Sequence, residues 1–229
     1  MKKFDNKNFQ SHVTANRILN QAMRIFLEKG YHGTSIDDIT RAAKLTKGAL
    51  YWHFRSKEDL LKRIIEEYEG RFLDGMIQAV NEVRGSILQK IETYFQYNAA
   101  FAYYNRELCV SFDTLAAELV GAHHGVEIEF RRIYKKYRKF LSNLIVQGKK
   151  EKVFKKEIDA NLAALVIIAF HVGILLQWSM NKDEIDGEAY VNTFKKIMLQ
   201  GLMEKAIQYA TQRKSFGSPI GSFQAIQLK

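Results

Sequence analysis

Proline is almost absent from this chain: Pro219 is the only one among 229 residues. Because proline interrupts helices, its absence ahead of that position removes the strongest breaker of helical structure. Apolar residues recur at helical spacing, and no segment shows the strict alternation of a half-buried strand. The sequence therefore predicts an all-α protein. The expected long helices cover residues 11–29, 57–83, 86–104, 107–120, 126–147, 160–180 and 188–212.

The segment from Thr34 to Leu61 is the most specific part of the sequence. Thr34 or Ser35, each with an acidic residue three positions later, fits a capping box at the start of a short helix. Lys44-Leu45-Thr46 then ends that helix, and Thr46 can cap a second short helix. A helix, a turn of three or four residues and a second helix form the layout that places the second helix in the major groove of DNA.

The polar residues of this segment divide into two groups, because phosphate contacts position a protein on DNA and base contacts specify the sequence. Six residues can clamp the phosphate backbone: Thr34, Ser35, Lys44, Tyr51, His53 and Lys57. Four others, around the start of the second helix, can approach base edges: Thr46, Lys47, Gly48 and Ala49. Trp52 joins this DNA-binding set. The alternative is that the aromatic residues are core and the lysines are solvated surface.

The same residues carry a resemblance to a known family. The segment from Ile18 to Leu61 is similar to the N-terminal DNA-binding domain of the TetR family of bacterial repressors, above all in the run from Thr46 to Phe54. Lys44 departs from the pattern, since members usually carry glycine there. A positive φ at that position would cost a lysine about 1 kcal/mol. The resemblance implies a transcriptional regulator with two helical domains.

The expected domain organisation follows from this resemblance and from the helical pattern. Residues 1–60 form a helix-turn-helix DNA-binding domain, residues 61–212 a helical effector-binding and dimerisation domain, and residues 213–229 an irregular tail. The formal net charge of +10 favours an anionic partner. Residues 1–60 hold eleven Lys and Arg against six Asp and Glu, so +5 of that charge lies in the first domain.

The last two long helices predict a homodimer. The stretch from Leu162 to Trp178 is apolar nearly all round, so one face can pack on its own domain and another on a partner. In the resembling family the last two helices of each subunit form a four-helix interface, and a two-fold dimer places two reading helices on a near-palindromic operator. The alternative is that both helices are ordinary monomer core.

The middle of the chain is dense in aromatic residues, which line apolar ligand pockets but also fill plain cores. The candidate effector-binding residues are Tyr94, Tyr97, Phe101, Tyr104, Phe112, His171 and Trp178. The resemblance implies that a small molecule bound in this domain changes the separation of the reading helices. The composition favours an apolar or aromatic effector, lipid-like ones included.

Other classes of protein fit less well. Cys109 is the only cysteine, so neither an internal disulfide nor a cysteine metal cluster can form. A metal site could be suggested by His123, His124 and Glu127, but their spacing is common by chance. The sequence contains no glycine-rich loop of the kind that binds phosphate. The sequence therefore predicts a protein that is not an enzyme and that has neither catalytic residues nor a bound metal or cofactor. The 162–178 stretch is short for a membrane span, and the start of the chain lacks an apolar leader, which favours the cytoplasm.

The predicted function is a ligand-responsive repressor that leaves its palindromic operator when the effector binds. One alternative is a DNA-binding regulator whose C-terminal domain binds a protein partner and no small molecule. Another is an enzyme or carrier built on a helical bundle, for which the N-terminal pattern is incidental.

Overall fold

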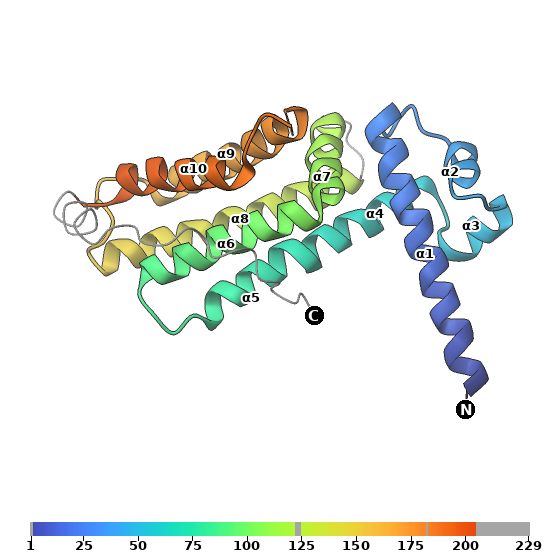
Figure 1. Cartoon of the computed structure of the whole chain (residues 1–229), viewed down its shortest axis with the longest axis horizontal. Coiled ribbons are helices and arrows are strands. Elements are labelled where there is room, and N and C mark those ends of the chain that lie inside the picture. Colours follow the sequence, from blue (N-terminus) through green and yellow to red (C-terminus); the bar gives the residue numbers. More distant parts are fainter. Residues whose placement is uncertain (1, 122–124, 182, 205–229) are drawn as a thin grey trace. The chain divides into compact units, whose positions relative to one another are not determined.

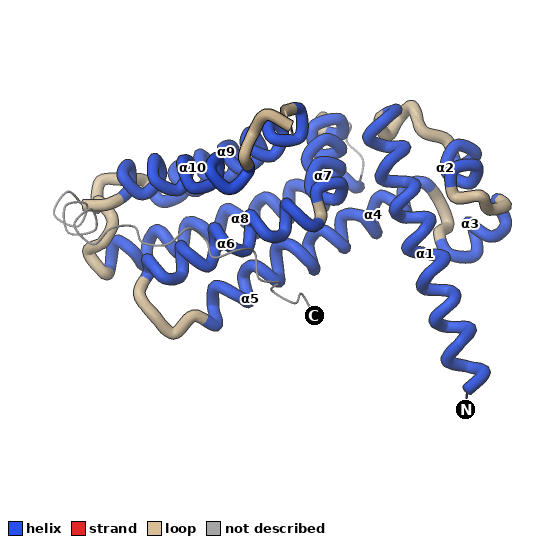
Figure 2. Tube along the Cα trace, viewed as in Figure 1, coloured by secondary structure: helices blue, strands red, loops and turns tan. Residues whose placement is uncertain are grey.

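The computed structural model describes residues 2–121, 125–181 and 183–204, and within these ranges helices are joined by short loops and turns (Figures 1 and 2). The described residues contain no strand, only the isolated bridge between Phe154 and Met203. The all-α prediction is confirmed. The elements are α1 (Lys2–Lys29), α2 (Ile36–Ala42), α3 (Lys47–His53), α4 (Lys57–Tyr68), the π-helix η1 (Glu69–Asp74), α5 (Gly75–Glu82), α6 (Ile87–Tyr104), α7 (Arg106–Leu119), α8 (Gly125–Lys150), α9 (Ala160–Met180) and α10 (Gly187–Leu202).

Side-chain caps explain where several helices begin. Ser35 and Asp38 form the capping box of α2, and Ser86 with Gln89 forms that of α6. The side chains of Ser56 and Asp159 accept the first free backbone N–H groups of α4 and α9. Each cap satisfies donors that have no partner inside the helix, so these polar residues set the helix boundaries.

Three helices differ in extent from the expectation. α10 ends at Leu202, with Met203 as its C-cap, before the predicted end at residue 212. α1 begins at Lys2, well before the predicted start near residue 11. The predicted single helix 57–83 is instead α4 and α5 separated by the π-helical turn η1. There the hydroxyl of Tyr97 donates to the carbonyl of Arg71 at 2.6 Å. A Cβ at Gly75 would lie 2.2 Å from that hydroxyl oxygen, so only glycine fits beside this contact.

The chain forms two compact units, and each unit is built from two segments that are separated in the sequence. Unit 1 comprises Met1–Gly70 and Glu107–Arg132, and unit 2 comprises Arg71–Arg106 and Ile133–Lys229. Unit 1 thus takes in α7, which lies far along the chain from the helix-turn-helix. The ring of Phe112 in α7 stacks on Tyr68 at a centroid distance of 3.7 Å, and Arg132 pairs with Glu69.

The core of unit 1 is built from the apolar stripe of α1 and the helices around it. Ile18, Ala22 and Phe26 are fully buried, as are Ile39 of α2 and Leu50 of α3. These residues are the ones whose helical spacing predicted the first helix and the helix-turn-helix. α2 and α4 pack on α1, and α3 packs on α2.

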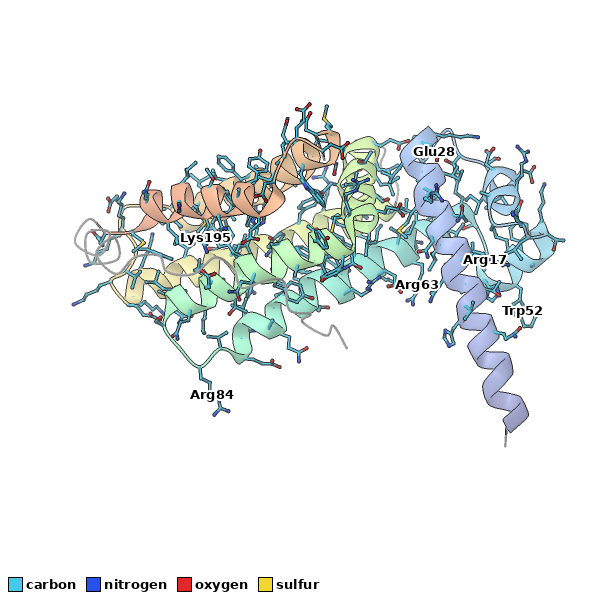
Figure 3. The ribbon with its side chains drawn as sticks, viewed as in Figure 1. Arg17, Glu28, Trp52, Arg63, Arg84 and Lys195 are labelled. Carbon is cyan, nitrogen blue, oxygen red and sulfur yellow. The ribbon has the colours of Figure 1, made fainter. Side chains whose placement is uncertain are left out.

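Unit 2 is a bundle in which α6 packs against α5 and α10, and α9 packs against α10 (Figure 1). Lys195 of α10 points toward α6, where its Nζ lies 3.0 Å from a carboxylate oxygen of Glu92 (Figure 3). Buried aromatic residues fill the interior, among them Tyr94, Phe95, Phe101 and Phe194.

Helix α9 exposes many of its apolar side chains in the single subunit. Ala164, Ile167 and Ile168 are its buried residues, whereas Leu162, Val166 and Met180 are 62%, 53% and 71% exposed. Among the described helices, α9 is the one long and apolar enough to cross a membrane, a test that buried core helices also pass. In the single subunit α9 thus buries some of its apolar residues and exposes others, and the predicted contact of its second face with a partner stays a prediction.

Candidate DNA-binding surface and effector site

Helix α3 is anchored by a few apolar residues and presents its polar side to solvent. Leu50 is fully buried and Phe54 nearly so. Thr46 is the predicted N-cap: its Oγ1 accepts the backbone N–H of Ala49 at 3.2 Å. This cap and two apolar anchors leave the rest of the helix free to contact a partner.

The exposed face of α3 carries Lys47, Tyr51 and Trp52. The two aromatic side chains are 50% and 81% exposed, and Trp52 extends from the helix into solvent (Figure 3). Exposure of this degree contradicts the alternative that they are plain core. Gly48 has open space around its Cα, so a partner surface can approach the helix closely. Lys47 forms an exposed ion pair with Asp37 of α2 at 2.7 Å.

The predicted phosphate-binding residues are placed in different ways. Thr34 is buried, and its hydroxyl donates to the carbonyl of Gly30 at 2.6 Å, whereas Ser35 serves in the capping box of α2. Lys44 is exposed and adopts a φ of 52°, the left-handed conformation in which glycine is usual. His53 is half-buried at the end of α3. A DNA contact by each remains a prediction.

Lys57 is the centre of a polar cluster inside unit 1, which we call the Lys57 cluster (Tyr31, Thr34, Lys57 and Glu118). The ammonium donates to the carbonyls of Tyr31 at 2.6 Å and Thr34 at 2.8 Å, and it lies 4.3 Å from the centre of the Tyr31 ring. Burial lowers the pKa of Lys57, and the nearby Glu118 carboxylate opposes that shift. The ammonium expected to bind phosphate is therefore already occupied by the protein.

Glu118 of α7 completes this cluster. Its two carboxylate oxygens accept the backbone N–H groups of Tyr31 at 2.7 Å and His32 at 3.0 Å, in the turn after α1. Sequence reasoning missed Glu118. No local pattern points to it, because the contact joins residues more than eighty positions apart.

Comparison with known families decides the class of the protein. The family described as "Bacterial regulatory proteins, tetR family" matches residues 18–64, which contain the helix-turn-helix. The family described as "YsiA-like protein, C-terminal region" matches residues 65–201, more than half of the chain. This chain belongs to the TetR family. It is thus a transcriptional regulator and no enzyme, as the sequence predicted.

Individual relatives of this TetR-family regulator are distant. It is 22% identical over 189 residues to the fatty acid metabolism regulator protein of Bacillus subtilis, covering 82% of this chain and 95% of the relative. The MbdR regulator of Azoarcus sp. CIB shares the fold with a TM-score of 0.75 at 24% identity, covering 83% of this chain and all of the other. The FadR regulator of Bacillus subtilis in complex with stearoyl-CoA has a TM-score of 0.67 at 22% identity, covering 81% and 97%.

The structure brings together only some of the predicted effector-binding residues. Tyr94, Tyr97 and Phe101 are buried in unit 2. Tyr104 is 56% exposed at the end of α6. Phe112 lies in unit 1, between the rings of Tyr68 and Phe130. The density of aromatic residues along the sequence therefore reflects two separate cores, because α6 and α7 belong to different units.

His171 does meet Tyr94, in what we call the hydroxyl–imidazole cluster (Tyr94, Tyr137 and His171). Tyr94 Oη lies 2.8 Å from both Tyr137 Oη and His171 Nδ1, and Tyr137 Oη lies 2.9 Å from the same nitrogen. The cluster joins α6, α8 and α9. Sequence reasoning missed Tyr137, although its position on the buried stripe of α8 predicts that it faces inward.

The remaining candidates lie apart from this cluster. Trp178 has the guanidinium of Arg106 at 5.9 Å from its ring. A groove of about 330 Å³ between α5 and α8 contains none of the predicted effector residues; Ile77, Lys139 and Phe140 are among those that line it. His123 and His124 lie outside the described residues, and Glu127 pairs with Arg131. The described residues contain no group suited to hold a metal ion.

Proposed function

We propose that this regulator is a homodimeric repressor that reads a near-palindromic operator with α3. The exposed Lys47, Tyr51 and Trp52 on a short, capped helix carry this proposal. Thr46, Lys47, Gly48 and Ala49 approach base edges, and Lys44, Tyr51 and His53 contact phosphate oxygens. The positive net charge favours association with DNA.

Dimerisation through α9 and α10 supports the proposed function. Both helices expose apolar side chains on a single subunit, among them Val166 and Phe170 of α9 and Ile197 of α10. A large apolar face left in water is unfavourable, and a second copy of the same face covers it with two-fold symmetry. The resulting cytoplasmic dimer carries two reading helices.

The proposed effector is an apolar or aromatic small molecule, lipid-like ones included, bound in unit 2. The buried aromatic interior and its small set of polar groups are typical of such sites. A relative with the same fold is described in complex with stearoyl-CoA, which fits an effector with a long apolar chain. The effector releases DNA only if it binds more tightly to the conformation whose reading helices do not match the operator than to the one whose helices do.

The test is to select DNA fragments that bind the full chain at near-physiological salt. We expect an enriched inverted repeat. Lys47→Ala should change the preference at one base position by about 1–3 kcal/mol, whereas Tyr51→Phe should weaken binding equally on all sequences. A folded protein that enriches no sequence, with or without cell extract, contradicts the proposal. Sedimentation of a monomer that remains monomeric on DNA contradicts the dimer.

A further inference from the structure

The turn between α1 and α2, residues 30–34, is held from two sides by charged side chains of other helices. On one side the Glu118 carboxylate of α7 accepts the backbone N–H groups of Tyr31 at 2.7 Å and His32 at 3.0 Å. On the other side the Lys57 ammonium of α4 donates to two backbone carbonyls of the same turn. The conformation of the turn is therefore set by α4 and α7 as well as by its own residues.

The Glu118 carboxylate approaches the turn so closely that a glycine is needed beside it. Gly30 has a φ of 72°, and a Cβ on this residue would lie 3.1 Å from both carboxylate oxygens. A carboxylate that accepts two neighbouring N–H groups forms stronger and more directional hydrogen bonds than a neutral acceptor does. Glu118 therefore fixes the position of the turn relative to α7.

The turn leads directly into the helix-turn-helix. Thr34 is buried, and its hydroxyl donates to the carbonyl of Gly30 at 2.6 Å. The next residue, Ser35, is the N-cap of α2, and α3 packs on α2. A shift of the turn therefore moves the start of α2 and, with it, the reading helix α3.

Helix α7 can hold the turn because it is itself anchored in unit 1. Phe112 stacks on Tyr68 of α4 at a centroid distance of 3.7 Å, and Leu115 and Leu119, on either side of Glu118, are buried. The family match assigns α7 to the C-terminal region, yet the helix belongs to the compact unit that contains the helix-turn-helix. A part of the C-terminal region thus supports the DNA-reading helices.

We propose that Glu118 is a positioning residue for sequence recognition: its carboxylate holds the turn 30–34 in the conformation that aligns α3 with base edges, without contacting DNA itself. The inference rests on the proposed function, because it assumes that α3 reads an operator. Base reading depends on the placement of α3, whereas attraction to DNA of any sequence depends on charge. Glu118 therefore controls the preference for the operator over other DNA.

Glu118→Gln distinguishes positioning from charge, because the two effects on operator affinity have opposite signs. Removal of a negative charge from a DNA-binding unit raises the affinity for DNA of every sequence. Glutamine replaces one carboxylate oxygen by an NH2 group, which cannot accept the second backbone N–H, so the turn adopts other conformations as well. If the aligned conformation falls to about one tenth of the population, operator affinity falls about tenfold.

The experiment measures two affinities of the full-length chain by fluorescence anisotropy: that for the operator fragment which the unmodified protein selects, and that for a duplex of equal length and scrambled sequence. We expect the ratio of the two affinities to fall about tenfold in Glu118→Gln, while the affinity for the scrambled duplex stays equal or rises. Glu28→Gln removes an exposed acid from α1 and should keep the ratio. An unchanged ratio in Glu118→Gln overturns the proposal.

A merely structural role of Glu118 predicts a different result, because unfolded protein lowers both affinities by the same factor. Ile18→Val removes one methyl group from the core of unit 1 and is the control for stability. An equal fall of the ratio in Ile18→Val overturns the proposal. If thermal melts show that Glu118→Gln does not fold, Glu118→Asp takes its place. Aspartate keeps the charge but is too short to reach both N–H groups, so the ratio should fall here too, and a full ratio overturns the proposal.

Hydrogen exchange at the backbone amides of Tyr31 and His32 provides a second readout. We expect both amides to exchange faster in Glu118→Gln than in the unmodified chain, because they lose their acceptor. Unchanged exchange at both amides overturns the contact on which the proposal is built. If the unmodified chain selects an operator and the variant keeps the full affinity ratio, this inference fails and the proposed function stands. If no operator is selected, the proposed function has failed, and this inference fails with it.

Discussion

Each of the two units contains a partly buried polar cluster, and the two clusters differ in charge. The Lys57 cluster of unit 1 surrounds an ammonium with two backbone carbonyls, an aromatic ring and a nearby carboxylate. The hydroxyl–imidazole cluster of unit 2 consists of neutral side chains on three helices. The first satisfies its central cation from the protein itself. The second joins two hydroxyl groups and an imidazole to one another without a formal charge.

This difference in charge predicts different consequences for stability. Removing a partner from a partly buried charge is costly, so we expect the Lys57 cluster to stabilise unit 1. Neutral groups lose less free energy when a partner is missing. We therefore expect changes in the first cluster to affect stability most, and changes in the second to affect the pH dependence of stability.

Replacing Lys57 by methionine should have the largest effect. The carbonyls of Tyr31 and Thr34 lose their donor, and Glu118 loses the positive charge beside it. We expect the free energy of unfolding of unit 1 to fall by about 2–3 kcal/mol, measured by urea denaturation. Lys62→Met is the matched control, because Lys62 forms an exposed pair with Glu58 and should contribute less than about 0.5 kcal/mol.

The same variant distinguishes the structural role of Lys57 from the phosphate contact that the sequence predicted. If the ammonium contacts phosphate, Lys57→Met reduces the log–log salt slope of DNA binding by about one unit and leaves stability unchanged. That result would contradict the structural role of Lys57, because its ammonium would then bind DNA. A loss of stability with an unchanged salt slope supports the structural role.

The contacts of these two clusters also show what the sequence could and could not predict. Thr46 as a cap and the capping box of Ser35 were predictable, since each depends on residues within four positions. The positive φ of Lys44 was indicated only by the family resemblance, in which glycine is usual at that position. Glu118 and Tyr137 were not identified. Their partners lie tens of residues away, and only the packing of whole helices brings such pairs together. Helical spacing predicts which side chains face inward and says nothing about which ones meet.

The pH dependence of stability sharpens the description of the neutral cluster. The pKa of His171 is about 4 in the folded chain against an ordinary value near 6.5, so the unfolded chain binds a proton first as the pH falls. The folded state is therefore destabilised progressively from about pH 6.5 to pH 4. Between pH 7 and pH 5 we expect a loss of about 1–2 kcal/mol in urea denaturation that His171→Phe lacks. An equal loss in both proteins would show that other groups cause it.

The smallest effect on stability is expected at the outer face of unit 1, where Lys47 and Asp37 form an exposed ion pair. Asp37→Asn frees Lys47 without leaving any buried group unpaired, so the free energy of unfolding should change by less than about 0.5 kcal/mol. DNA affinity at low salt should nevertheless rise by about three- to tenfold, because the ammonium becomes available and a negative charge near the phosphates is removed.

Glu28→Gln controls for the change in net charge, since Glu28 is an exposed acid at the end of α1 (Figure 3). A larger gain for Asp37→Asn than for Glu28→Gln, measured on the same DNA by fluorescence anisotropy, places Lys47 at the DNA. Equal gains would show that the loss of one negative charge anywhere on the surface explains the effect. A loss of affinity would mean that Asp37 positions Lys47 for its contact with DNA. Lys47 would then resemble Lys57 after all, a cation whose role depends on its partner within the protein.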